Sequence, residues 1–86
     1  ELLDTRAVIL LRRGDAKQAL QDLEFALGED ESALLYYHRA EAQAPSSPSA
    51  ARNSLARARE LKFTRRSLHP LERKSYDEFL QSMGEK

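Results

Sequence analysis

The sequence predicts an all-α fold of five helices, and three observations support this prediction. Apolar residues recur at intervals of three and four along most of the 86 residues, which is the spacing of one helix face. Only three glycines and three prolines are present, so long regular segments are possible. No stretch alternates apolar and polar residues as a half-buried strand would. We therefore expect one small helical domain.

The first helix is expected over residues 1–13, because its apolar residues share one face. These residues are Leu3, Ala7, Leu10 and Leu11. Gly14 follows as the stop, since glycine readily adopts the left-handed conformation that ends many helices. Asp15 is then a suitable N-cap for the second helix, because its side chain can accept a hydrogen bond from a backbone amide of the first turn.

The second and third helices are expected over residues 16–27 and 31–44. The apolar stripe of the second comprises Ala16, Ala19, Leu20, Leu23, Ala26 and Leu27. Gly28 is expected to end it. Acidic residues in the first turn of the third helix suit the positive end of the helix dipole, and Pro45 is expected to stop this helix. The apolar surface of the third comprises Leu34, Leu35, Tyr36, Tyr37, Ala40 and Ala44.

The last two helices are expected to begin with proline. Ser47 is a suitable N-cap for a helix over residues 48–62, with Pro48 at its first position. Its apolar face comprises Ala51, Leu55, Ala58 and Leu61. Pro70 similarly opens a final helix after an irregular basic stretch. The apolar face of that helix comprises Leu71, Tyr76, Phe79, Leu80 and Met83.

The second and fourth predicted helices repeat one pattern of small and large apolar residues. The matching pairs, each 32 residues apart, are Ala19 and Ala51, Leu23 and Leu55, and Ala26 and Ala58. Alanine at such positions allows two helix axes to approach closely. We therefore divide one domain, residues 1–86, into a first hairpin over residues 1–30, a second over residues 31–62, and a linker with a final helix over residues 63–86.

This repeat resembles the tetratricopeptide repeat family, whose units of about 34 residues each form two antiparallel helices. The residues that carry the resemblance in the first unit are Leu3, Ala7, Leu10, Gly14, Asp15, Ala19, Leu23 and Ala26, and in the second Tyr36, Ala40, Ala51, Leu55 and Ala58. The second turn departs from the pattern, because Ser46, Ser47 and Pro48 replace Gly-Asp. The resemblance implies a right-handed α-solenoid of antiparallel hairpins, closed by a C-terminal capping helix.

The same resemblance implies a non-catalytic scaffold that binds a protein or peptide on its concave face. In the family this face is lined by the first helix of each hairpin. The corresponding residues are Asp4, Thr5, Val8, Leu11, Arg12, Leu34, Tyr37, His38 and Glu41. Tyr37 is expected to offer a large, rigid contact surface, as interface hot spots do.

Two other functions remain open. The first helix has no N-cap and could dock on further repeats or on a second copy, which would make the chain an assembly module. Weak nucleic-acid binding is the second alternative, because residues 45–86 carry nine basic and five acidic residues whereas residues 1–44 carry five and nine.

No enzyme, cofactor, metal site or small-molecule substrate is expected. Cysteine is absent, and Ser67, His69 and Asp77 lack the strand-turn-helix frame of a nucleophile. His38 has only Glu41 at metal-ligand spacing, which is a weak signal. A cytoplasmic location is the default expectation, since no signal peptide or apolar run of about 20 residues is visible. A chain that begins with Glu1 is expected to be a fragment of a longer protein.

Overall fold

The computed structural model describes residues 2–84, and side-chain surroundings from residue 5 onward. It contains five α-helices and one short 3₁₀ helix, with no strand in this range. The elements are α1 (Leu2–Arg12), α2 (Ala16–Glu29), α3 (Ala33–Gln43), α4 (Pro48–Glu60), η1 (Arg65–Ser67) and α5 (Pro70–Ser82). The predicted all-α class and the five helices are confirmed. None of the described helices combines the length and apolarity that a membrane span requires.

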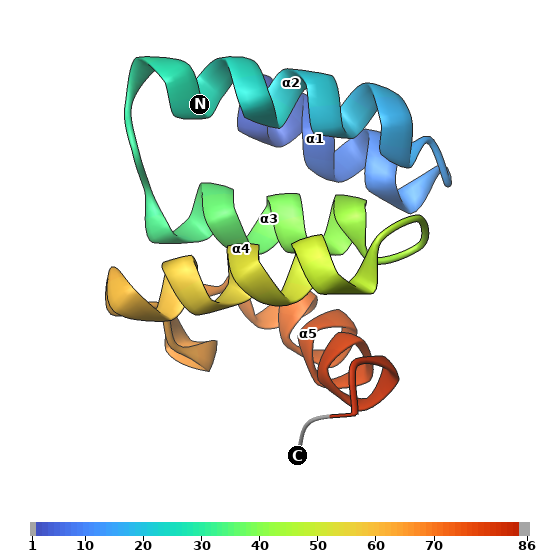
Figure 1. Ribbon diagram of the computed structural model, residues 1–86, viewed down its shortest axis with the longest axis vertical. Helices are drawn as coiled ribbons and strands as arrows, with labels where there is room; N and C mark the ends of the chain where they lie inside the picture. The colour runs from blue at the N-terminus through green and yellow to red at the C-terminus, as the bar shows by residue number, and fades with distance from the viewer. Residues whose placement is uncertain (1, 85–86) are drawn as a thin grey trace.

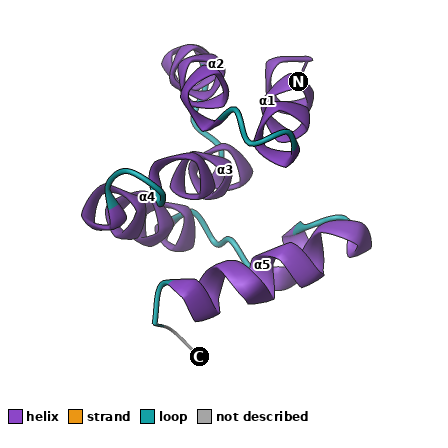
Figure 2. Cartoon of the chain, turned by 90° about the vertical axis from the view of Figure 1, so that its right-hand side faces the viewer, coloured by secondary structure: helices purple, strands orange, loops and turns teal. Residues whose placement is uncertain are grey.

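The helices form two antiparallel pairs with the last helix lying across them. The pair of α1 and α2 lies above the pair of α3 and α4, and α3 packs against α1, α2 and α4 (Figure 1). A view turned by 90° shows α1 to the right of α2 and α3 to the right of α4, with α3 beneath α2 (Figure 2). In that view α5 is seen lengthwise whereas the other four are seen end-on, so α5 runs crosswise beneath the pair of α3 and α4.

The turn between α1 and α2 follows the predicted chemistry. Gly14 has a φ of +83°, and its amide donates to the Leu11 carbonyl at 3.1 Å. The Asp15 amide donates to the Leu10 carbonyl at 2.8 Å. Together these two bonds satisfy the last carbonyls of α1 in the manner of a Schellman motif. The Asp15 side chain also accepts a hydrogen bond from the Gln18 amide, which confirms it as the N-cap of α2.

Two predicted boundaries are wrong at the next turn. Gly28 lies inside α2, which continues to Glu29, because a glycine that keeps helical dihedrals costs a helix only about 1 kcal/mol relative to alanine. The third helix begins at Ala33 instead of residue 31. Ser32 is its N-cap and accepts a hydrogen bond from the Leu35 amide at 3.3 Å, so the predicted acidic first turn lies before the helix.

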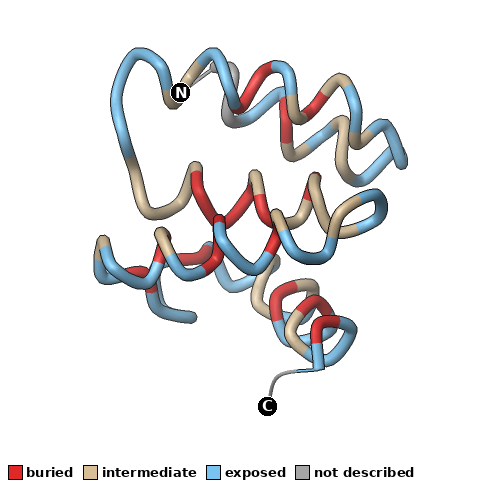
Figure 3. The backbone as a smooth tube through the Cα atoms, in the orientation of Figure 1, coloured by how far each residue is buried: buried red, intermediate tan, exposed pale blue. Residues whose placement is uncertain are grey.

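The core consists of two clusters that share α3, where buried positions recur along the helix (Figure 3). The smaller cluster joins α1 and α2 to α3 and comprises Ala7, Ala19, Leu23 and Ala42. The larger cluster joins α3, α4 and α5 and includes Ala40, Ala51, Leu55 and Ala58. The repeated leucines Leu23 and Leu55 are therefore both core residues, at 0% and 1% exposure.

Aromatic side chains attach α5 to the second pair of helices. The Tyr37 ring stacks on Phe63 with 5.0 Å between centroids. It also forms T-shaped contacts with Tyr76 and Phe79, at 5.4 and 5.8 Å between centroids, an arrangement that aromatic pairs favour. Tyr37 is fully buried, so the expectation that its ring lies open in a groove is wrong: α5 covers it.

A charged pair joins the first two helices. The Arg6 guanidinium on α1 donates two hydrogen bonds to the Asp22 carboxylate on α2, at 2.7 and 2.8 Å. Asp22 is buried, whereas Arg6 is exposed. The hydrogen bonds from Arg6 lower the pKa of the Asp22 carboxyl below its ordinary value, and burial opposes this shift only in part.

This lowered pKa predicts an acid-sensitive contribution to stability. Because the folded pKa of Asp22 lies below the unfolded value of about 3.9, its contribution is present above that value and is lost as pH falls through the folded pKa. Urea denaturation of wild type and Asp22→Asn, from pH 7 to pH 3, should show a smaller stability difference at low pH. Asp30→Asn, at an exposed position, is the control and should track wild type throughout.

The end of α4 uses a lysine where glycine is usual. Lys62 has a φ of +72°, and the Phe63 amide donates to the Ala58 carbonyl at 3.0 Å across this turn. A side chain in the left-handed region is strained, because its Cβ crowds the following carbonyl.

Lys62→Gly is therefore expected to raise the free energy of unfolding by about 0.5–1 kcal/mol, the relief of strain exceeding the cost of a more flexible unfolded chain. Thermal and urea denaturation measure it. Gly14→Ala, at the equivalent turn with a φ of +83°, should have the opposite sign. Two changes of the same sign would contradict the assignment of both turns.

Candidate functional site

The predicted groove residues lie in three environments. The exposed ones are Thr5 and Arg12. The half-buried ones are Val8, Leu11 and Leu34. The buried ones are Tyr37 and His38, together with the Glu41 side chain, which is 10% exposed. The side chain of Asp4 lies outside the described residues. The structure therefore does not present the predicted set as one open surface.

Three of these residues converge on a fourth that sequence reasoning missed. Arg12 lies 3.8 Å from a Glu41 oxygen and 3.7 Å from Glu72 Oε1. His38 Nε2 lies 3.0 Å from the same oxygen of Glu72. The four side chains come from α1, α3 and α5, and we call them the charged cluster. This cluster is the candidate functional site.

Local rules explain how each member reaches the cluster. His38 and Glu41 are three residues apart on α3 and so share one helix face. Glu72 lies in the first turn of α5, whose start is fixed by Pro70 and by His69, because His69 Nδ1 accepts a hydrogen bond from the Leu71 amide at 3.2 Å. Arg12 ends α1, where a cation complements the helix dipole.

Two buried polar atoms, one in the cluster and one beside it, have no hydrogen-bond partner of good geometry among the described residues. They are Glu41 Oε1 and the Tyr37 hydroxyl. Burial raises the pKa of the Glu41 carboxyl, and Arg12 and His38 counteract this rise. Burial, followed by the negative charge of Glu41, also raises the pKa of the Tyr37 hydroxyl. An unpartnered buried oxygen is costly, so these two atoms mark a place where a ligand would be stabilised.

The sequence contained one signal for Glu72 that was not used. His69-Pro70 predicts a helix start, and an acid in the first turn of such a helix is common. Residue spacing does not predict that α5 approaches α3, because Glu72 lies 34 residues from His38 in the sequence. Only the crossing of α5 beneath the stack brings the two side chains together.

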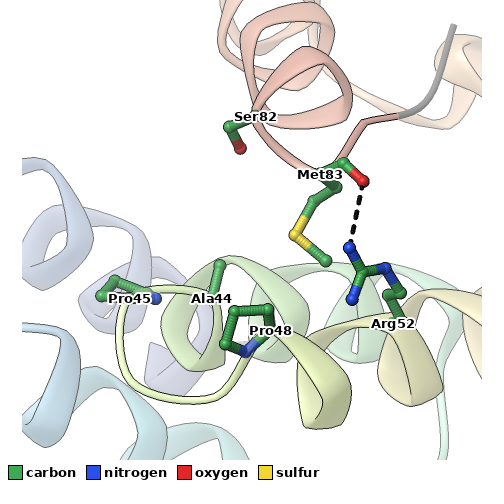
Figure 4. A pocket seen from close by; sticks show the side chains of 6 residues that line it. All are labelled: Ala44, Pro45, Pro48, Arg52, Ser82 and Met83. Carbon is green, nitrogen blue, oxygen red and sulfur yellow. Dashed lines mark hydrogen bonds between the residues drawn. The ribbon is translucent and has the colours of Figure 1, made fainter.

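A shallow hollow lies at the opposite end of α5 (Figure 4). It is lined by Ala44, Pro45, Pro48, Arg52, Ser82 and Met83 and has a volume of about 410 Å³. The Arg52 guanidinium donates to the Met83 carbonyl at 3.4 Å across its edge. No buried ionisable side chain lines this hollow, so it is a weaker candidate than the charged cluster.

The other residues considered for chemistry have structural contacts. Ser67 Oγ accepts a hydrogen bond from the Thr64 amide, and Asp77 accepts two from Arg65. Arg57, in the basic half of the chain, pairs with Glu31 and Glu60. These acids offset part of the positive charge that a phosphate backbone would require.

Comparison with protein-family models, curated proteins and solved structures finds no match for this chain. The resemblance to tetratricopeptide repeats therefore depends on the residues quoted above.

Proposed function

We propose that the chain is a non-catalytic protein-interaction module, a tetratricopeptide-like solenoid whose binding face is formed by α1 and α3. The arrangement of the helices supports this proposal. In both pairs the first helix, α1 or α3, lies on the same side of its partner, α2 or α4 (Figure 2). The repeated alanines Ala19, Ala51 and Ala58 are fully buried, as close packing of such pairs requires.

The observation that carries the proposal is the mixed surface of α1. Thr5, Val8 and Arg12 follow one another at helical spacing, so they share one face. Thr5 and Arg12 are exposed and Val8 is half-buried. An apolar contact flanked by polar side chains is typical of a protein-binding surface. We infer a protein or peptide partner that offers an apolar side chain to Val8 and an acidic group to Arg12.

Site-specific photo-cross-linking tests this function. A photoreactive amino acid at Thr5 on α1 should cross-link a partner in extracts of the source organism. The same group at Gln21, an exposed position on α2, is the matched control and should not. Val8→Asp should abolish the Thr5 cross-link. Cross-linking from Gln21 alone, or a Thr5 cross-link that Val8→Asp leaves unchanged, would contradict the proposed face.

Self-association is a second candidate function, favoured by two exposed apolar side chains. Ile9 on α1 and Phe25 on α2 are 49% and 64% exposed. In a repeat array such side chains would be covered by a neighbouring unit. Sedimentation equilibrium should then show a dimer or larger species that Phe25→Glu dissociates. If the chain stayed monomeric at concentrations up to about 100 μM, which is about 100 times a dissociation constant of 1 μM, this function would be excluded.

A further inference from the structure

The charged cluster contains the donor set of a metal site. One ligand atom from each of His38, Glu41 and Glu72 can be chosen so that all three lie within 4.8 Å of one another. We propose that these three side chains bind a divalent transition-metal ion of the Zn²⁺ class. This goes beyond the proposed interaction function, because the site lies between α3 and α5 and does not need a protein partner.

The distances are close to those that an ion would impose. Zinc bonds of about 2.1 Å to nitrogen and oxygen place neighbouring ligands about 3.4 Å apart in a tetrahedral site. His38 Nε2 and Glu72 Oε1 are already 3.0 Å apart. A Glu41 oxygen lies within 4.8 Å of both ligand atoms, so the Glu41 carboxylate has to approach them to complete three ligands. The remaining position is left for water or for a group from another molecule.

The buried oxygen of Glu41 is an independent indication of a ligand. Glu41 Oε1 has no hydrogen-bond partner among the described residues, although the side chain is nine-tenths buried. The Tyr37 hydroxyl is fully buried beside the same carboxylate and lowers its pKa, but no hydrogen bond of good geometry joins the two groups. A cation bound to Glu41 would supply the missing interaction, which a buried carboxylate oxygen otherwise lacks at considerable cost.

Arg12 occupies the position of a replaceable counter-ion. Its nitrogens lie 3.8 Å from Glu41 and 3.7 Å from Glu72, which is too far for good hydrogen bonds. Its side chain is 42% exposed and can therefore turn toward solvent. One divalent ion neutralises the two carboxylates by itself, so metal binding would release Arg12.

A bound ion would also stabilise the packing of α5 against α3. His38 and Glu41 belong to α3 and Glu72 belongs to α5, so the ion would connect the two helices directly. Since the ion binds a site that only the folded chain assembles, it would raise the melting temperature in proportion to the logarithm of its concentration.

Calorimetric titration of the untagged chain with Zn²⁺ tests the proposal. We expect one Zn²⁺ per chain and a rise in melting temperature. Mg²⁺ at the same concentration should bind at least tenfold more weakly, because it prefers oxygen ligands and keeps its own water. Failure of wild type to bind Zn²⁺, or equal binding of Mg²⁺, would overturn the assignment of this site.

Variants locate the bound ion. Glu41→Gln and Glu72→Gln should each weaken Zn²⁺ binding at least tenfold, and circular dichroism should show that both remain folded. Arg12→Gln should tighten binding several-fold, because it removes the competing cation. Glu78→Gln, at an exposed position on α5, is the control and should bind as wild type does. Binding that persists in both glutamine variants at positions 41 and 72 would show an adventitious surface site and overturn the proposal.

Discussion

Tyr37→Ala is expected to lower the free energy of unfolding by about 3–5 kcal/mol, the usual cost of removing a buried aromatic ring. The ring is fully buried and contacts Phe63, Tyr76 and Phe79. Its loss would leave a cavity between α3 and α5 and remove all of these ring contacts at once. Urea denaturation followed by circular dichroism measures the change.

Tyr37→Phe is the matched control and should behave differently. The ring and its stacking remain, and the hydroxyl that is removed has no hydrogen-bond partner among the described residues. Since a buried unsatisfied hydroxyl is costly, this variant is expected to be as stable as wild type or more stable by about 1 kcal/mol. A phenylalanine variant as unstable as the alanine variant would show that the hydroxyl, and not the ring, holds this region together.

Leu23→Ala and Leu55→Ala are each expected to lower the free energy of unfolding by about 2–5 kcal/mol. The two leucines occupy equivalent positions 32 residues apart and are 0% and 1% exposed. Each anchors the core cluster of its own helical pair. Chemical denaturation with a shared slope gives both values.

The control for these two changes is Leu71→Ala. Leu71 is 84% exposed, so its truncation should alter stability by less than about 0.5 kcal/mol. If only one of the two buried leucine substitutions lowered the free energy of unfolding, the two leucines would not have equivalent roles. That result would contradict the structural equivalence of the two helical pairs.

Local signals in the sequence predicted the starts of α2 and α4 correctly. Asp15 and Ser47 were expected as caps, and each accepts a hydrogen bond from an amide of the helix that follows. Such signals succeed because capping involves neighbours within a few residues. The prediction failed at Gly28 because a glycine without a left-handed φ can remain inside a helix, and the sequence alone does not reveal that angle.

The candidate site was only partly predictable for a different reason. Arg12, His38 and Glu41 were expected on one face because they belong to the first helices of the two pairs. The sequence did not predict Glu72 as a member of the site, and it wrongly predicted that the Tyr37 ring is accessible. Both the position of Glu72 and the burial of Tyr37 depend on how α5 lies across α3. The apolar pattern of residues 70–82 predicts which face of that helix is buried, but it does not predict the direction in which the helix crosses its neighbours.

The crossing of α5 beneath α3 is the central structural claim, since it both buries Tyr37 and brings Glu72 to His38. Nuclear Overhauser spectra of the chain test it directly through the ring protons of Tyr37. We expect cross-peaks from this ring to Phe63, Tyr76 and Phe79, which lie 5.0, 5.4 and 5.8 Å away between centroids. A Tyr37 ring that shows cross-peaks only to residues of α3 and α4 would contradict the crossing and, with it, the assembly of the charged cluster.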